Sequence, residues 1–170
     1  MKRIGRTGFT LVEIMIVVAI IALLAAIAIP NVIRGRATAN ESAAVGNMRA
    51  LVNALEMYRS TNNEYPAAWR LDLYTNATPD YGPPSFDLDL AAAVEVQGYN
   101  YIYARTGTAA TQTYTLDAYP TVTSNGTRAF FVDEDGTPLH CRCPAGSCTA
   151  AVNAGPAAPS TALNVLPGNC

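Results

Sequence analysis

Charge is scarce in this 170-residue sequence, and lysine is almost missing from it. The chain has 11 basic and 13 acidic residues, and Lys2 is its only lysine. Lys2, Arg3 and Arg6 all fall in the first eight residues, and without them 8 of the 11 basic residues remain against 13 acidic ones. Nucleic-acid binding needs a clustered basic face. The composition therefore argues against nucleic acid as a partner.

Sequence patterns for catalysis and for metal binding are missing as well. No nucleotide-binding loop, Ser/His/Asp set or C-x-x-C pair is present, and His140 is the only histidine. His140 fits a turn or an edge strand better than a catalytic role. Asp133 and Asp135 could ligate calcium, but full EF-hand spacing is absent and Asp135-Gly136 is itself a turn signal. We therefore predict no enzymatic activity, no cofactor and no metal.

Polar residues are absent from Ile14 to Ile29. The 21 residues from Phe9 to Ile29 would form a helix of about 31 Å, which is enough to cross a bilayer core. An acid at the centre of such a helix costs about 2.5–3.5 kcal/mol, and less near an end. The apolar residues can offset this cost for Glu13. The acid nevertheless needs a reason to be there.

Three interpretations of this segment compete. The first is an uncleaved membrane anchor, with the N-terminal basic residues in the cytoplasm and everything after Pro30 outside it. The second is a general secretory signal, cut after Ala26-Ile27-Ala28 and before Ile29. An acid is unusual in the apolar part of such a signal, and an amphipathic helix continues past the cut. The third interpretation accounts for both the acid and the glycine before Phe9.

The segment GFTLVEIMIVVAIIALLAAIAIP resembles the N-terminus of type IV prepilins and of type II secretion pseudopilins. The likeness covers about thirty residues: a short basic leader, Gly8 before Phe9, the letters TLVE, the apolar run and Pro30. It implies that prepilin peptidase cuts after Gly8 and that Phe9 becomes N-methylated. It also implies that Glu13 pairs with the amino group of Phe9 on a neighbouring subunit during assembly. The simpler interpretation is that Glu13 is favoured by the helix dipole in the first turn. Both can hold together.

An amphipathic helix is predicted to follow the apolar segment. Pro30 removes one backbone hydrogen bond and bends or loosens a helix without having to end it. One apolar stripe then recurs at helical spacing: Ala44, Met48, Leu51, Leu55 and Tyr58. We expect one helix from Phe9 to Arg59, because residues 60–63 break the helical pattern after it. This predicts a lollipop-shaped subunit with the helix as its stalk. The outer half of the stalk would pack on a head domain, and the inner half would pack on the stalks of other subunits.

The head is predicted to contain a small antiparallel sheet. Residues 64–97 are expected to form a long loop with a short helix near Leu88–Val96. Tyr99, Tyr101 and Tyr103 alternate with other residues in YNYIYAR, which indicates a strand. Further strands are expected at Thr111–Thr123, Thr127–Asp133 and Thr137–Arg142, with hairpin turns at Asn125-Gly126 and Asp135-Gly136.

These elements make a meander of three or four strands. One face of the sheet would bury Met48, Leu51 and Leu55 of the helix. The alternating tyrosines are then explained by cross-strand aromatic pairs within the sheet. The predicted fold class is α+β, and the head is similar to type IV pilin heads.

Cysteine is absent until the last thirty residues, which hold all four. Outside the cytoplasm an even number of cysteines favours disulfides. A Cys141–Cys143 bridge would close a strained small ring, so we favour Cys143–Cys148 with Cys141–Cys170 over the remaining pairing. His140 with Cys141, Cys143 and Cys148 is the zinc alternative, but tight C-x₂-C knuckles are absent. A disulfide-bonded C-terminal region is also what the pilin resemblance implies.

The sequence thus predicts a pilin-like structural subunit that polymerises through its N-terminal helix. The alternatives are a secretion pseudopilin and a single-pass anchored binding or zinc domain. Expected partners are other copies, related pilins, prepilin peptidase, an inner-membrane assembly platform and membrane lipid. The expected location is the bacterial inner membrane, then a periplasmic or extracellular filament. The predicted parts are a leader at 1–8, a membrane-spanning half-helix at 9–29, an amphipathic half-helix at 30–60 and a head at 61–170.

Overall fold

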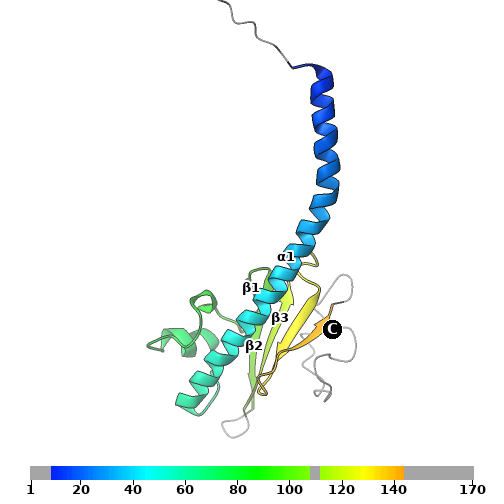
Figure 1. Cartoon of the computed structure of the whole chain (residues 1–170). Helices are drawn as coiled ribbons and strands as arrows, with labels where there is room; N and C mark the ends of the chain where they lie inside the picture. Colours follow the sequence, from blue (N-terminus) through cyan, green and yellow to red (C-terminus); the bar gives the residue numbers. More distant parts are fainter. Residues whose placement is uncertain (1–8, 108–111, 144–170) are drawn as a thin grey trace, which may run out of the picture. The chain divides into compact units, whose positions relative to one another are not determined.

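The computed structural model describes residues 9–107 and 112–143 (Figure 1). The chain forms two compact units, residues 1–35 and residues 36–170. The helix α1 (Leu11–Asn62) contributes to both units, and the second unit also contains a five-stranded sheet. One long N-terminal helix with an antiparallel sheet confirms the predicted α+β class.

Helix α1 is 52 residues long and has Pro30 inside it, so the prediction that this proline does not end the helix is confirmed. The helix runs three residues further than predicted. Its end is set by Asn63, whose φ of 57° lies in the left-handed region. The N–H of Asn63 donates to the carbonyl of Arg59 (2.8 Å), and an asparagine in this conformation is a common C-terminal stop.

The sheet is a meander in the order β1-β2-β3-β4-β5, and each strand is antiparallel to the next. The strands are β1 (Val94–Val96), β2 (Tyr99–Thr106), β3 (Thr113–Pro120), β4 (Arg128–Val132) and β5 (Leu139–Arg142). The predicted meander is therefore confirmed, but it has five strands instead of three or four. Strand β5 is an edge strand that begins directly after Pro138, as expected for a residue that cannot donate to the ladder.

The predicted helix near Leu88–Val96 is wrong. Residues 94–96 of this stretch form β1, which pairs with β2 in the register Val96↔Tyr99. Gln97 (φ 53°) and Gly98 (φ 79°) make the two-residue connection, and two positive φ values are what a tight hairpin turn requires. The long loop before β1 contains two short turns instead, η1 (Leu71–Thr75) and η2 (Pro84–Phe86).

The Asn125-Gly126 pair lies between two paired strands, as predicted, but it does not form a two-residue turn. Strands β3 and β4 pair through Ala118↔Phe130, and residues 121–127 connect them. Gly126 is needed for another reason, because a Cβ at this position would overlap the Tyr99 hydroxyl. The second predicted turn is confirmed: Gly136 has a φ of 69° and its N–H donates to the carbonyl of Asp133 (2.9 Å).

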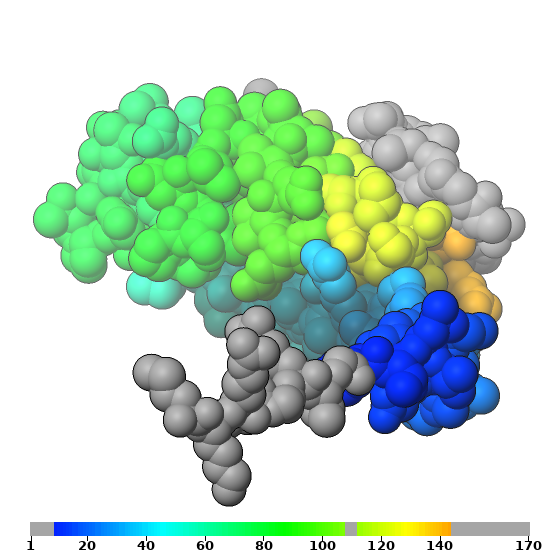
Figure 2. Space-filling view, turned by 90° about the horizontal axis from the view of Figure 1, so that it is seen from above, coloured from blue at the N-terminus to red at the C-terminus, as the bar shows by residue number. Residues whose placement is uncertain are grey.

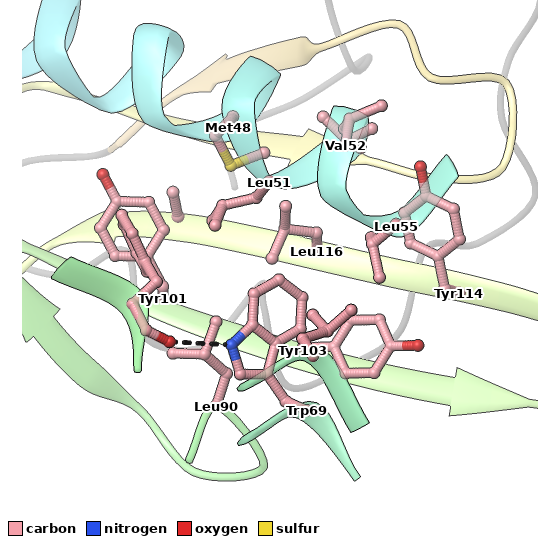
Figure 3. Close-up of a cluster of buried hydrophobic side chains, with 14 of the residues drawn as sticks. Met48, Leu51, Val52, Leu55, Trp69, Leu90, Tyr101, Tyr103, Tyr114 and Leu116 are labelled. Carbon is pink, nitrogen blue, oxygen red and sulfur yellow. Dashed lines mark hydrogen bonds between the residues drawn. The ribbon is translucent and has the colours of Figure 1, made fainter. Parts of the chain in front are cut away.

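The core lies between α1 and one face of the sheet (Figure 3). Met48, Leu51 and Leu55 are 0% exposed, which confirms the predicted apolar stripe. On the facing side of the sheet, every second residue of β2 and β3 is buried in the same core: Tyr99, Tyr101, Tyr103, Tyr114, Leu116 and Ala118.

The tyrosines of β2 pack against aromatic residues of the loop before β1 and of other strands. Tyr103 lies against Trp69 (ring centroids 5.1 Å apart) and Tyr101 against Phe86 (4.9 Å). Trp69 Nε1 also donates to the carbonyl of Phe86 (3.1 Å), so the loop before β1 is held on the core. Tyr103 also lies near Tyr114 of β3 (6.3 Å) and Tyr99 near Phe130 of β4 (6.0 Å), so the tyrosine pattern is explained by packing on aromatics of both the sheet and the loop.

Replacing Leu51 with alanine should lower the free energy of unfolding by about 2–5 kcal/mol, because it leaves a cavity where no solvent enters. Met57 is on the same helix but is 55% exposed, so Met57→Ala is the matched control and should cost under about 1 kcal/mol. Trp69 is the only tryptophan and is buried, so its fluorescence during denaturant titration of the full chain in detergent reports unfolding of this core. Equal costs for the two variants would contradict the packing described.

Candidate functional site

The candidate site from the sequence is the start of α1. Gly8 lies outside the described residues, so the predicted cleavage position has no structural account. Phe9 is the first described residue, and it is 85% exposed. Glu13 lies in the first turn of the helix, where its negative charge is favoured by the helix dipole.

Thr10 and Glu13 hydrogen-bond to each other's backbone. The backbone N–H and the hydroxyl of Thr10 both donate to Glu13 Oε2 (2.8 and 2.7 Å). The backbone N–H of Glu13 donates in turn to Thr10 Oγ1 (3.2 Å). This is a capping box, in which two side chains satisfy amides that the first turn of a helix leaves without partners. Sequence reasoning missed Thr10, although the spacing T-x-x-E in TLVE was the available signal.

The cap uses only one of the two oxygens of the Glu13 carboxylate. Both bonds from Thr10 end on Oε2, and within residues 9–107 and 112–143 no hydrogen bond or ion pair ends on Oε1. A carboxylate can accept several hydrogen bonds. Glu13 can therefore hold the start of α1 and still bind a second donor.

The segment of α1 that follows is apolar and uncovered. Its best 18-residue window has a mean hydropathy of 3.0, and none of that window is buried inside the protein. The large side chains are between 47% and 75% exposed, and in the space-filling view the start of the helix, in dark blue, lies at the surface (Figure 2). They are Leu11, Val12, Ile14, Met15, Ile16, Val17, Val18, Ile20, Ile21, Leu23, Leu24, Ile27, Ile29, Val32 and Ile33.

An apolar surface of this kind is usually covered by lipid or by another protein. Soluble monomers rarely expose contiguous apolar patches larger than a few hundred Å². By length and composition this one helix could cross a membrane. The first unit of the chain thus presents an apolar helix whose N-terminal turn carries a capped acid.

The residues considered for calcium lie in the turn between β4 and β5. The N–H of Asp135 donates to Asp133 Oδ1 (3.2 Å), so the first carboxylate is used within the turn. No group of three or more His, Cys, Asp or Glu side chains that could hold a metal ion occurs in the part of the chain that the structure describes. The turn explains these acids without a ligand.

The C-terminal cysteines are only partly described. Cys141 is a buried residue of β5, and Cys143 directly follows this strand. Cys148 and Cys170 lie outside the described residues, so the pairing of the four cysteines stays a prediction. His140 lies in β5, as expected for an edge strand, and its ring is 6.5 Å from that of Phe130.

Residues 4–29 match the family described as the prokaryotic N-terminal methylation motif. The N-terminal segment of this chain therefore carries that methylation motif. The matched range contains Gly8, Phe9, Thr10 and Glu13 together with the exposed apolar helix. This motif segment is the part of the protein that both the sequence pattern and the family model identify.

Curated relatives bear the names of a type II secretion core protein and of type IV pilins. The type II secretion system core protein G of Aeromonas hydrophila is 41% identical over 66 residues, which is 39% of this chain and 46% of the relative. The type IV wide pilus major component PilA4 of Thermus thermophilus is 42% identical over 74 residues, 42% of this chain and 56% of the relative. The type IV major pilin protein PilA of Myxococcus xanthus is 52% identical over 58 residues, 34% of this chain and 26% of the relative.

The pilin-type match is therefore partial. The chain spans about half the length, or less, of these curated relatives. No solved structure matches the chain significantly.

Proposed function

We propose that this chain is a structural subunit that prepilin peptidase cleaves after Gly8 and that polymerises through α1 into a type IV pilus-like filament. The observation that carries the proposal is the coincidence of three features in one segment. The methylation motif covers residues 4–29, Glu13 caps the helix there, and the apolar side chains after it are uncovered. This combination suits packing in lipid first and among identical helices later. No catalytic step is part of the proposal.

Glu13 would act in assembly through the oxygen that the cap leaves open. Cleavage after Gly8 creates a new amino group on Phe9, which keeps its positive charge after one methylation. An isolated carboxylate among apolar helices is costly, and a fixed cation from a neighbour relieves that cost. Only a subunit at the correct axial position supplies this cation. The pair would therefore select the register of subunits more than it adds net stability.

The proposed placement follows from charge. Lys2, Arg3 and Arg6 precede the apolar helix and would stay in the cytoplasm, with the head in the periplasm or outside the cell. Disulfides Cys141–Cys170 and Cys143–Cys148 would then hold the C-terminal region in an oxidising compartment. The longer of the two loops would contribute about 3–4 kcal/mol in a chain-entropy account. The partners would be other copies and related pilins, prepilin peptidase, the assembly platform and membrane lipid.

A pseudopilin of a type II secretion system is the second candidate. Relatives named as core protein G of that system in Aeromonas hydrophila and Vibrio cholerae are 41% and 43% identical over similar stretches. The N-terminal segment serves either role. Deleting the gene in the host separates them: loss of surface fibres supports a pilus subunit, and loss of protein export with fibres intact supports a pseudopilin.

Processing can be tested by mass spectrometry of the protein recovered from its host. The mature chain is expected to begin at N-methylated Phe9. A Gly8→Val variant should accumulate as uncut precursor, because a side chain at this position would block the peptidase. Gly5→Val in the same leader is the matched control and should be processed normally. A mature chain that begins at Ile29 or at Met1 would contradict the filament proposal.

A further inference from the structure

The second face of the sheet is turned away from α1. In β3, Leu116 and Ala118 belong to the core that α1 covers, and successive residues of a strand point to opposite faces. Asp117 and Tyr119 therefore lie on the other face, which we call the outer face. Asp117 pairs there with Ile102 of β2 and Phe131 of β4.

The outer face is buried, although one face of a two-layer α+β domain is ordinarily solvated. The exposed fraction is 9% for Asp117, 7% for Tyr119 and Phe131, 6% for Cys141 and 3% for Ala129. Of these, Tyr119, Ala129 and Cys141 form a small cluster of their own. Apart from Ala54, every buried residue of α1, η1 and η2 belongs to the other cluster, the one between α1 and the sheet, which indicates that these elements cover the opposite face.

The surroundings of Asp117 indicate what kind of segment buries the outer face. Within the described ranges its carboxyl forms no hydrogen bond or ion pair, and its strand neighbours Ile102 and Phe131 are apolar. Burial raises the pKa of this carboxyl to about 7. A cationic cover would favour the charged form, so the arrangement fits a cover without charged side chains.

One segment of this chain has no charged side chains and begins next to the outer face. Residues 144–170 follow directly after Cys143, beside β5, and contain no Asp, Glu, Lys, Arg or His. Five strands span roughly 20–25 Å, whereas 27 residues can reach up to about 90 Å, so the segment is long enough to cross the sheet and return. The predicted partner of Cys170 is Cys141, which lies on this face.

We propose that the outer face of the sheet is the docking surface of the C-terminal segment, residues 144–170 of the same chain, which packs over Asp117, Tyr119 and Phe131. The inference does not rest on filament formation, since it concerns one copy of the chain. It gives the small, uncharged tail a structural role as the second layer of the head. It also makes the tail part of the folded domain.

A photo-cross-linking residue tests this directly. p-Benzoylphenylalanine placed at Phe131 in the full chain, in detergent micelles, should cross-link to peptides from residues 144–170 after irradiation. The adjacent Phe130 is equally buried but faces α1, so it is the matched control and should cross-link to α1 or β2 peptides. Mixing ¹⁵N-labelled and unlabelled protein distinguishes a bond within one chain from a bond between two.

Several outcomes would overturn the proposal. Cross-links from position 131 to a second copy, to residues 108–111, to detergent alone or to another protein would each show a different occupant. If the Phe131 variant fails to give the buried fluorescence of Trp69, the probe moves to Leu139, which is half-buried and pairs with Phe131 on the same face. The expected cross-link from Leu139 is again to residues 144–170, and its absence would reject the docking.

Discussion

Glu13→Gln should leave cleavage after Gly8 intact and lower the yield of filaments at least tenfold. The amide can still accept a hydrogen bond from Thr10, so α1 begins as before. It cannot neutralise the amino group of Phe9 on a neighbouring subunit, and a cation left among apolar helices costs several kcal/mol. The measurement is the mass of filaments sheared from cells, set against the total mature protein. Wild-type filament yield would show that the carboxylate has no role in assembly.

Thr10→Val separates capping from assembly. It removes the hydroxyl that donates to and accepts from Glu13, at a cost of about 1 kcal/mol in helix stability, and leaves the carboxylate in place. Filaments should therefore form close to wild-type levels. If Thr10→Val and Glu13→Gln reduced assembly equally, the cap would be the important feature and the proposed charge pair would not.

The shortage of lysine gives a direct assay for the charge pair. If the leader is removed after Gly8 as proposed, Lys2 leaves with it, the mature chain would have no lysine, and the Phe9 amino group would be its only amine. A carbodiimide joins an amine to a carboxylate only when the two are in contact. Treated filaments should therefore contain a Phe9–Glu13 bond between subunits, and the Glu13→Gln variant should lack it.

The second large effect is expected at Asp117. Asp117→Asn should raise the free energy of unfolding by roughly 2–4 kcal/mol at pH 8 and change it little near pH 4. Burial raises the pKa of this carboxyl from 3.8 to about 7, so the folded state favours the neutral acid that asparagine imitates. Between these two values the folded protein binds more protons than the unfolded chain. The contribution of Asp117 to stability therefore falls as pH rises from about 4 to about 7 and is level above that.

The test is a series of denaturant titrations of wild-type and variant protein from pH 4 to pH 8, followed by Trp69 fluorescence. The difference between the two proteins should grow with pH and then level off. Asp80→Asn, which alters an exposed acid, is the matched control and should show no such trend. A constant difference for Asp117→Asn across the range would mean that this carboxyl is solvated in the folded protein.

Periodicity was enough to predict the parts of the fold that depend on one buried face. The stripe through Met48, Leu51 and Leu55 and the alternation of Tyr99, Tyr101 and Tyr103 both identify residues that the structure buries. Such patterns succeed because burial of one face repeats at the period of the element. The apolar N-terminal helix was predictable from composition for the same reason.

Short or tertiary features were not predictable in this way. The stretch Leu88–Val96 is rich in leucine and alanine and suggests a helix, but its last three residues pair with β2 instead. Asn125-Gly126 has the letters of a tight turn, whereas Gly126 is required by the ring of Tyr99. Asp117 occupies a position that alternation assigns to solvent, and only the folded structure shows that it is buried.

The strand order has a consequence for how the head folds. Because every strand pairs only with its neighbours in sequence, sheet formation closes short loops and costs little chain entropy. Such local contacts lower the contact order of the sheet and favour folding on a scale of about milliseconds, one hairpin after another. The amphipathic part of α1 is more distant in sequence, so we expect it to pack on the sheet after the strands have paired. All residues of the core between α1 and the sheet lie in the second unit, residues 36–170, so the head can fold without contacts from the apolar part of the helix.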